Sequence, residues 1–504
     1  MARLHEYQGK ALLKQAGIPI PEGDPAATPE EARAIAERIG TPVAVKMQAW
    51  TTHRASMGGI RFADTPEEAA AAARDLLGKQ VGAFAVERVL VERKLKLDAE
   101  YYASVIIDDA ARQPVLLFST AGGTGIEERA KGGQAGVAIM HIDVTTGLAD
   151  HAARNLARQA GLAGTVQRDV GAALVRLVDV FTKYDARNAE INPLVVTAEG
   201  KVLAADCRIT IDDYAVRRHP ELGITIAREM DHPPTKLERI AQKVEDEDFR
   251  GTFYFAQLAT GFGPDERYVG FHGAGGGGSM MSMDAITDAG FKIANFTDTS
   301  GNPSAAKVYR AAVIICHQPN IIGYFGSGSG VASQEQFHSA YGLAKAFHEM
   351  RLNIPAVIRL GGNSEDRAVD ILARAGADLP APVEGYRKDD APAFCAQRFK
   401  ELVEQHSAPA EPMRWHKPTP PKDAYSFPIA GGKVYIDHAK CDETTCAVLM
   451  EYGQGIFKLE GGKPVLAIDA KEVAGKNSEL IACEVECRAR ANDAVYVELP
   501  IEGL

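Results

Sequence analysis

Three segments in the second half of the chain each run from an apolar stretch through a glycine turn into a helical pattern. They read RYVGFHGAGGGGSMMSMDAITDAG, AAVIICHQPNIIGYFGSGSG and IPAVIRLGGNSEDRAVDILARAG. This order predicts a parallel sheet covered by helices, because parallel strands need crossover connections. Ligands of such sheets bind at the carboxyl ends of the strands, so we expect a site at these glycine turns.

The first half of the chain alternates helices and strands. Helices are predicted at ATPEEARAIAERIG and TPEEAAAAARDLLG, where a Thr-Pro-Glu start suits the first turn. Strands are predicted at TPVAVKMQ, FAVERVLVERK, AEYYASVIID and PVLLFS, and a hairpin at AEINPLVVTAEGKVLAADCRI. The N-terminal stretch MARLHEYQGKALLKQAG is predicted as an amphipathic helix with Leu4, Tyr7, Ala11 and Leu12 on one face.

Size and charge exclude several classes of protein. The 504 residues give room for two to four domains. A net charge of −11 without a basic stripe argues against nucleic-acid binding. No apolar run is long enough to span a bilayer, and the charged N-terminus does not fit a signal peptide. We therefore expect a cytoplasmic protein that binds neither nucleic acid nor membrane.

The end of the chain differs in composition from the rest. Residues 406–425, HSAPAEPMRWHKPTPPKDAY, are proline-rich and polar, which predicts a linker. A small β-rich segment, residues 426–504, follows it. Three of the seven cysteines, Cys207, Cys316 and Cys395, are scattered and predicted to be buried thiols. The other four cluster in the last segment: Cys441, Cys446, Cys483 and Cys487.

The predicted hairpin carries hard oxygen ligands on both strands. Glu190 and Asn192 lie in AEINPL, and Asp206 lies in AADCRI. Mg²⁺ beside a triphosphate prefers one or two carboxylates together with substrate phosphates. A metal site is one interpretation, and a surface hairpin with an Asn-Pro turn is the other.

Motifs across about residues 1–405 resemble the β subunit of succinyl-CoA synthetase. They are LHEYQGKALLKQAGIPIPEG, VAVKMQ, VLVERKLKLDAEYYASVIIDDAARQPVLLFSTAGG, EINPL and ANFTDTSGNPSAAKVYRAA, in the family's order. The resemblance implies an ATP-grasp domain at 1–225 and a flavodoxin-like CoA-ligase domain at 226–405. It implies a reaction of a small carboxylic acid, CoA and ATP (or GTP), through an acyl phosphate and a phosphohistidine. An α-like partner would bind most of the CoA and carry that histidine, in a heterodimer or heterotetramer.

The resemblance also assigns roles to residues of the nucleotide site. Lys46 and Arg54 would contact ATP phosphates, and Glu92 and Glu100 would hold the adenosine part. Without the surrounding motif, the two glutamates would be interpreted as solvated strand charges. Asn192 and Asp206 would hold Mg²⁺, which agrees with the interpretation of the hairpin as a metal site.

The acid and phosphate site of the family falls on the turn FGSGSG. Ser327, Gly328 and Ser329 stand there, and backbone N–H groups at a helix start with two hydroxyls favour an anion site. A plain glycine turn is the alternative.

His272 replaces the family's asparagine at a position that contacts substrate. Histidine changes the size of the site and can carry charge near neutral pH, so the acid need not be succinate; the alternative is a histidine that caps the adjacent turn.

The nucleotide loop departs from the family pattern. The synthetase β subunits have His-Ala-Gly-Gly-Arg-Gly there, whereas this chain has WTTHRASM followed by Gly58 and Gly59. The stretch is more similar to that of NDP-forming acyl-CoA synthetases, which implies that His53 is a phosphohistidine that carries phosphate. The alternative is a surface histidine in a loop that has lost its nucleotide role.

Residues 426–504 resemble a small single-cluster ferredoxin. The shared features are the opening strand, the GIFKL strand and a late cysteine before AVYVEL. The four clustered cysteines would be ligands of a [4Fe–4S] cluster or zinc, although their spacing departs from Cys-x-x-Cys-x-x-Cys. The alternative is a docking module whose cysteines no longer bind a cluster.

Together these observations predict a multidomain α/β and α+β protein. It would combine an ATP-grasp domain, a flavodoxin-like parallel-sheet domain and a ferredoxin-like C-terminal domain. The predicted function is that of a β-type subunit of an ADP-forming acyl-CoA synthetase. The alternative is a non-catalytic binding or scaffolding subunit of the same origin.

Overall fold

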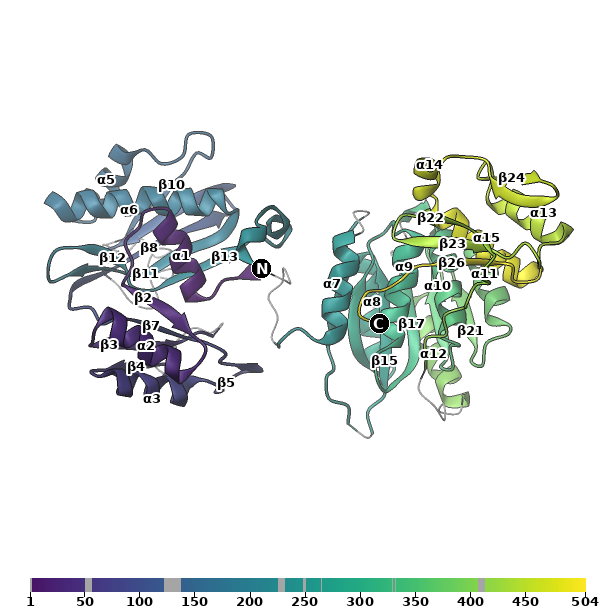
Figure 1. Ribbon diagram of the computed structural model, residues 1–504, viewed down its shortest axis with the longest axis horizontal. Helices are drawn as coiled ribbons and strands as arrows, with labels where there is room; N and C mark the ends of the chain where they lie inside the picture. The colour runs from purple at the N-terminus through teal and green to yellow at the C-terminus, as the bar shows by residue number, and fades with distance from the viewer. Residues whose placement is uncertain are drawn as a thin grey trace. The chain divides into compact units, whose positions relative to one another are not determined.

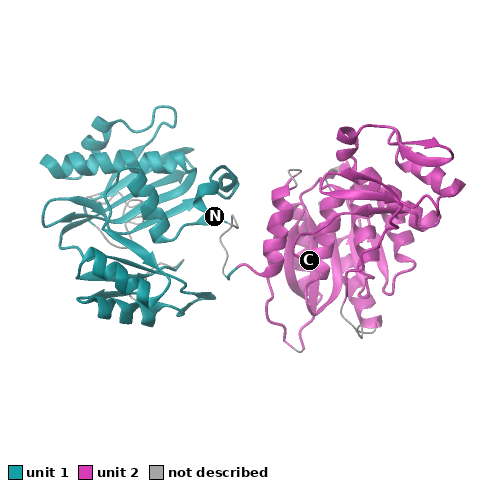
Figure 2. Cartoon of the chain, viewed as in Figure 1, with its two compact units in different colours: residues 1–233 teal, residues 234–504 magenta. Residues whose placement is uncertain are grey.

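The computed structural model divides into two compact units, residues 1–233 (unit 1) and residues 234–504 (unit 2) (Figure 2). It describes residues 2–49, 57–121, 137–224, 232–247, 251–263, 265–328, 330, 332–406 and 413–504. Compactness supports this division in two. The finer division into four segments stays a prediction.

Unit 1 contains a large antiparallel sheet in the order β1-β13-β11-β8-β9-β10, with β12 paired to β11. Helices α5 and α6 pack together, and α6 lies against β8 and β11 (Figure 1). The predicted strands and hairpin are confirmed. The elements are β1 (Ala2–Arg3), β8 (Leu97–Asp108), β9 (Gln113–Ser119), β10 (Val137–His141), α5 (Asp150–Gln159), α6 (Gly164–Lys183), β11 (Ala186–Thr197), β12 (Val202–Ala204) and β13 (Cys207–Ile211).

A smaller sheet of unit 1 has the order β2-β7-β3-β4 and is covered by α2 and α3. Both helices begin as predicted: the side chain of Thr28 accepts a hydrogen bond from Glu31 N at 3.1 Å, and that of Thr65 accepts one from Glu68 N at 3.2 Å. The elements are β2 (Gly23–Ala26), α2 (Pro29–Ile39), β3 (Val43–Met47), β4 (Ile60–Ala63), α3 (Pro66–Leu76) and β7 (Val89–Arg93). A short hairpin of β5 (Gln80–Val81) and β6 (Phe84–Ala85) precedes β7.

The N-terminal helix α1 (Glu6–Gln15) is confirmed, and its predicted apolar face is buried only in part, at Leu4 and Leu12. Ala11 is exposed, whereas Glu6 and Lys10 are buried together with Leu12. The hydrophobic pattern missed this because the two charges form buried ion pairs with each other and with other elements. Two short 3-10 helices, Asp213–Arg218 and Pro220–Leu222, follow β13 near the end of the unit.

Unit 2 is built on a six-stranded sheet in the order β14-β16-β15-β17-β19-β21. All neighbouring strands pair in parallel except β14, so the predicted parallel sheet is confirmed. Helices α8 and α12 pack together and against the sheet, while α9, α10 and α11 form a separate packed layer (Figure 1). The elements are α7 (Lys236–Glu247), β14 (Tyr254–Gln257), β15 (Tyr268–Ala274), α8 (Gly276–Asp288), β16 (Lys292–Asp298), α9 (Ala305–Cys316), β17 (Ile321–Gly328), α10 (Phe337–Glu349), β19 (Ala356–Arg359), α11 (Glu365–Gly376), β21 (Val383–Tyr386) and α12 (Pro392–Gln405). Two short strands, β18 (Ala332–Glu335) and β20 (Gly362–Asn363), pair with each other.

The C-terminal segment forms a small α+β module with a three-stranded sheet, β22-β23-β26. This arrangement confirms the predicted fold class. Its helix α15 packs on α9, α10 and α11, so the module shares one hydrophobic core with the parallel-sheet part of unit 2 (Figure 1). The elements are β22 (Tyr425–Ile429), β23 (Gly432–Ile436), α13 (Glu443–Tyr452), β24 (Phe457–Glu460), β25 (Lys463–Leu466), α14 (Ala470–Ala474), α15 (Asn477–Arg490) and β26 (Val495–Glu498).

A buried ion cluster ties the module to α10. The ammonium of Lys345 lies 2.6 Å from Glu349 and 2.7 Å from Glu484, and all three side chains are almost completely buried. Trp415, in the predicted linker, donates its indole N–H to Glu349 at 2.8 Å. Val497 N of β26 donates to Glu484 at 3.1 Å. The described part of the linker and the module are therefore held to the parallel-sheet part by hydrogen bonds and charge.

Among the residues that the structure describes, no helix has both the length and the apolar character needed to traverse a bilayer.

Candidate functional site

The first candidate site, in unit 1, centres on two buried lysines. Lys46, on β3, lies 3.1 Å from Glu6 of α1 and 2.5 Å from Glu92 of β7. Lys10, on α1, lies 2.9 Å from Glu6 and 2.5 Å from Glu92. Both ammonium groups also donate to the carbonyl oxygen of Ala205, each at 2.8 Å. Helix α1, strands β3 and β7 and the loop at residue 205 thus meet at a cluster of two lysines and two glutamates, in which each lysine contacts both glutamates.

Charge complementarity keeps Lys46 protonated. Burial by itself would lower its pKa, but the carboxylates of Glu6, Glu92 and Asp206 raise the pKa of Lys46 well above its ordinary value. Two lysines and two glutamates balance, so the cluster adds no net charge to the interior. A fixed cation of this kind, with Asp206 beside it, suits the binding of a metal-bound phosphate.

The predicted metal residues face each other across the hairpin. Asn192 N donates to the carbonyl oxygen of Asp206 at 3.1 Å, which brings the two residues side by side. The side-chain amide nitrogen of Asn192 donates to the carboxylate of Glu190 at 3.2 Å, and the backbone N–H of Cys207 donates to the carboxylate of Asp206 at 2.7 Å. Asn192 and Asp206 are both partly exposed. An amide oxygen and one carboxylate fit Mg²⁺ when phosphates supply the other ligands.

The structure says less about the other residues that are predicted to contact the nucleotide. Glu100 lies exposed on β8. Both carboxylate oxygens of Glu92 contact lysines, so Glu92 orients Lys46, and its predicted contact with adenosine stays a prediction. His53 and Arg54 lie outside the described residues, and their predicted roles stay predictions.

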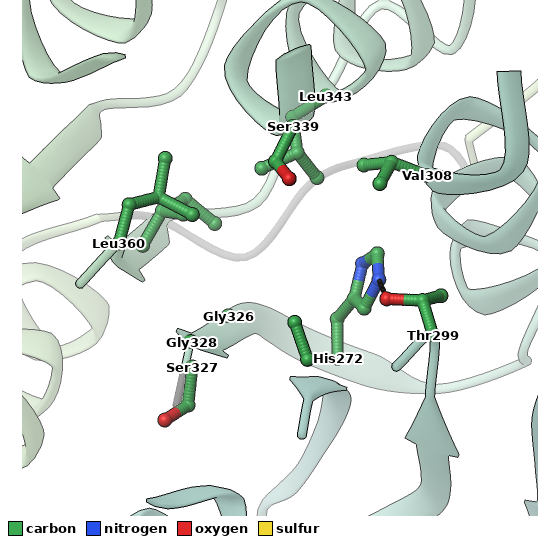
Figure 3. Close-up of a pocket in the computed structure, with 11 residues that line it drawn as sticks. His272, Thr299, Val308, Gly326, Ser327, Gly328, Ser339, Leu343 and Leu360 are labelled. Atoms are coloured by element: carbon green, nitrogen blue, oxygen red, sulfur yellow. Dashed lines mark hydrogen bonds between the residues drawn. The ribbon is translucent and has the colours of Figure 1, made fainter. Parts of the chain in front are cut away.

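The second candidate site is a small hollow in unit 2 with a cavity volume of about 20 Å³ (Figure 3). It lies at the carboxyl ends of β15, β17 and β19, next to α9 and α10, where the glycine turns predicted a site. Its polar lining includes His272, Thr299, Ser327, Gly328 and Ser339. Its apolar lining includes Ala274, Val308, Leu343, Ile358 and Leu360.

Hydrogen bonds fix the ring of His272. Its Nδ1 lies 2.5 Å from the hydroxyl of Tyr324, and its Nε2 lies 3.1 Å from Thr299 Oγ1. The Thr299 hydroxyl donates to the carbonyl of Gly273 at 3.2 Å, so Nε2–H donates to Thr299 and the Tyr324 hydroxyl donates to Nδ1. Burial lowers the pKa of His272 to about 3, and the ring is neutral at physiological pH. The sequence allowed a charged ring or a turn cap, whereas in the structure both ring nitrogens bond to side chains and the lowered pKa favours the neutral ring; the contact of His272 with substrate stays a prediction.

The FGSGSG turn differs from the anion site that the sequence predicted. Ser327 and Gly328 do line the hollow, but they end strand β17, and helix α10 begins only at Phe337. The Ser327 hydroxyl lies 2.7 Å from that of Ser282 on α8 and points away from the hollow (Figure 3). Successive strand residues point to opposite faces, which explains this direction. Ser329 lies outside the described residues.

Sequence reasoning did not single out several residues of both sites, although Glu6, Lys10 and Thr299 lie within motifs that carry the family resemblance. Glu6 and Lys10 are four residues apart on α1, a spacing typical of exposed helix pairs. Thr299 and Ser339 enter the hollow from a loop and from the first turn of α10 (Figure 3). Only the topology of a parallel sheet, which gathers strand ends at one edge, could have placed them there.

We expect acid to destabilise unit 2 through His272. Its pKa of about 3 in the folded chain lies below the ordinary value of 6.5. Between these pH values the unfolded chain binds a proton that the folded chain does not. The stabilisation is therefore complete above pH 6.5 and is lost as the pH falls, at up to about 1.4 kcal/mol per pH unit. In denaturation curves, His272→Asn should flatten this slope, and replacing the exposed His416 with Asn should not. An equal slope in both variants would contradict the assignment.

The four clustered cysteines do not form the predicted ligand set. Cys483 and Cys487 are buried in the core, and Ala494 N donates to Cys487 Sγ at 3.3 Å. Burial raises the pKa of Cys441 to about 12 and that of Cys483 further, which favours protonated thiols over thiolates. Within the described ranges, no three His, Cys, Asp or Glu side chains are grouped to hold a metal ion. The other three cysteines are buried thiols, as predicted.

Comparison with known proteins agrees with this architecture. A family model described as an ATP-grasp domain matches residues 3–196. Among solved structures, the chain is similar to ATP citrate lyase from Methanothrix soehngenii in complex with citrate and coenzyme A. The TM-score is 0.63 with 19% identity, over 79% of this chain and 99% of that chain, a likeness in fold. The first part of the chain is therefore an ATP-grasp domain.

Two relatives specify the family. The chain is 35% identical over 376 residues to the succinate–CoA ligase (ADP-forming) subunit beta of Rubrobacter xylanophilus, covering 74% of this chain and 93% of that protein. It is also 35% identical over 370 residues to the succinate–CoA ligase (GDP-forming) subunit beta of Thermus thermophilus, covering 73% and 93%. The chain belongs to the family of succinate–CoA ligase β subunits, and the resemblance seen in its motifs is confirmed.

Proposed function

We propose that the chain is the β-type subunit of an ADP-forming acyl-CoA synthetase. The reaction would convert a carboxylic acid, CoA and ATP into acyl-CoA, ADP and phosphate, through an acyl phosphate and a phosphohistidine. The proposal rests on one observation in a chain of this family. The charged Lys46 lies near Asp206, and Asp206 lies beside Asn192, so a cation and two oxygen ligands for a metal occur together. A positioned cation and a metal site are what phosphoryl transfer needs from a protein.

Each site has a role in this proposal. Lys46 would contact the nucleotide phosphates, held in position by Glu6 and Glu92. Asn192 and Asp206 would hold Mg²⁺, which neutralises charge on the transferring phosphate when it is bound. The acid would bind at the carboxyl edge of the parallel sheet, where the hollow of unit 2 lies, because this edge is the usual place for a ligand in such a sheet.

We propose further that an α-like partner completes the enzyme. The relatives are named as β subunits, and the partner would bind most of the CoA and supply the principal phosphohistidine. The complex would be a heterodimer or heterotetramer in the cytoplasm.

The purified single chain should form no acyl-CoA from ATP, CoA and an acid, whereas the co-purified complex should. The physical reason is that the two candidate sites serve the nucleotide and the acid and leave CoA to the partner. Affinity purification of the tagged chain from its native host, followed by mass spectrometry and an acyl-CoA assay, tests this. Full turnover by the single chain would contradict the need for a partner.

A further inference from the structure

Lys10 shares its counter-ions with Lys46 in the buried cluster of unit 1. Its ammonium lies 2.9 Å from Glu6 and 2.5 Å from Glu92, and both carboxylates also contact Lys46. The two oxygens of Glu92 are divided between the lysines, Oε2 to Lys10 and Oε1 to Lys46. Glu6 offers the same oxygen, Oε1, to both. A change in the charge of Lys10 therefore changes the electrostatic hold of the two carboxylates on Lys46.

The two lysines differ in their access to a ligand. The side chain of Lys46 is 11% exposed, whereas that of Lys10 is 3% exposed. Lys46 thus lies on the open side of the cluster, where a phosphate can approach its ammonium. Lys10 lies on the closed side, where its ammonium is surrounded by Glu6, Glu92 and the carbonyl oxygen of Ala205.

Lys46 has to give up a contact before it can bind a phosphate. An ammonium has three N–H donors, and Lys46 has three acceptors within reach: Glu6 at 3.1 Å, Glu92 at 2.5 Å and the carbonyl oxygen of Ala205 at 2.8 Å. Two buried carboxylates that shared a single cation would hold it strongly, because charges attract each other more in the interior than in water. With Lys10 in place, each carboxylate keeps a cation when Lys46 turns to a ligand.

We propose that Lys10 is a positioning residue that neutralises Glu6 and Glu92 and thereby makes Lys46 available to the nucleotide phosphates. This inference rests on the proposed function and adds a residue to its nucleotide site. Lys10 also supports the metal side of that site, because it donates to the carbonyl oxygen of Ala205 at 2.8 Å and Asp206 is the next residue. The role of Lys10 is one of charge, so its loss should be repaired when one of the two carboxylates is removed as well.

The test measures the Kd of MgADP for the co-purified complex by isothermal titration calorimetry. Lys10→Gln removes the charge but keeps N–H donors, and Kd should rise about tenfold, because the two carboxylates then hold Lys46 and repel the phosphates. Lys10→Gln combined with Glu6→Gln restores one carboxylate to one cation, and Kd should return to within about threefold of the wild-type value. Lys14→Gln, at an exposed position of the same helix, should leave Kd unchanged.

Lys46→Gln separates this inference from the proposed function. If Lys46→Gln weakens MgADP binding and Lys10→Gln does not, the inference is overturned while the proposed function stands. The same holds if the double variant binds no better than Lys10→Gln, because the removal of a charge does not restore a lost packing contact. Unchanged binding in Lys46→Gln, or no binding by the wild-type complex, would overturn both.

Glu6→Gln gives an independent check that does not depend on the folding of Lys10→Gln. This variant leaves two cations beside one carboxylate, so Lys46 should turn to the phosphates more readily and Kd should fall about threefold. A raised Kd in folded Glu6→Gln would mean that the carboxylate of Glu6 does not compete with the phosphates for Lys46, and it would overturn the inference.

Discussion

Replacing Lys345 with Met is expected to lower the free energy of unfolding of unit 2 by about 3–5 kcal/mol. Lys345 is 0% exposed and lies 2.6 Å from Glu349 and 2.7 Å from Glu484. Met keeps most of the volume but removes the ammonium from two buried carboxylates, and the remaining cation, Arg488, lies 3.6 Å from Glu484. The rings of Tyr309 and Tyr496, about 5 Å from the ammonium, would lose a cation–π contact as well.

Urea denaturation of the full chain measures this effect. Trp415 donates to Glu349, so its fluorescence reports on the cluster once the other tryptophan, Trp50, is replaced with Phe in all variants. Lys458→Met is the matched control, because Lys458 pairs with Glu460 at 2.7 Å on the exposed surface of the same module. Exposed pairs contribute little, and no measurable change is expected there. Equal changes in the two variants would show that the buried cluster does not hold the module to α10.

Asp206→Ala is expected to lower the Mg²⁺-dependent turnover of the complex at least a hundredfold, about 2.7 kcal/mol of transition-state stabilisation. Asp206 would supply the one carboxylate of the metal pair, and it also contributes to the raised pKa of Lys46. The variant should fold normally, because Asp206 is partly exposed and lies at a loop between β12 and β13.

Glu199→Ala is the control for this variant. Glu199 lies exposed in the turn of the same hairpin, and its removal should leave turnover unchanged. Circular dichroism would verify the fold of both variants, and initial rates at several Mg²⁺ concentrations would separate metal binding from chemistry. Wild-type turnover in Asp206→Ala would mean that the hairpin is only structural.

Local signals in the sequence predicted the elements well. Thr28 and Thr65 cap their helices as the Thr-Pro-Glu starts indicate, because a cap needs only residues within one turn. The glycine turns likewise located the edge of the sheet where the hollow lies, since the carboxyl ends of parallel strands gather there.

Long-range contacts could not be predicted. Lys345 pairs with Glu484, which is 139 residues away, and Lys10 pairs with Glu92, which is 82 residues away. A charged side chain on a helix is usually solvated, so the sequence favoured exposure for these residues. The neutrality of His272 was missed for the same reason, because burial by distant elements decides its pKa.

The most direct test of the account is the nucleotide product of the co-purified complex. With ATP, CoA and an accepted acid, chromatography should find ADP and phosphate formed one to one with acyl-CoA, and only when all three substrates are present. This result would establish an ADP-forming ligase that contains the chain. Formation of AMP and pyrophosphate, or no nucleotide hydrolysis at all while the complex remains intact, would contradict it.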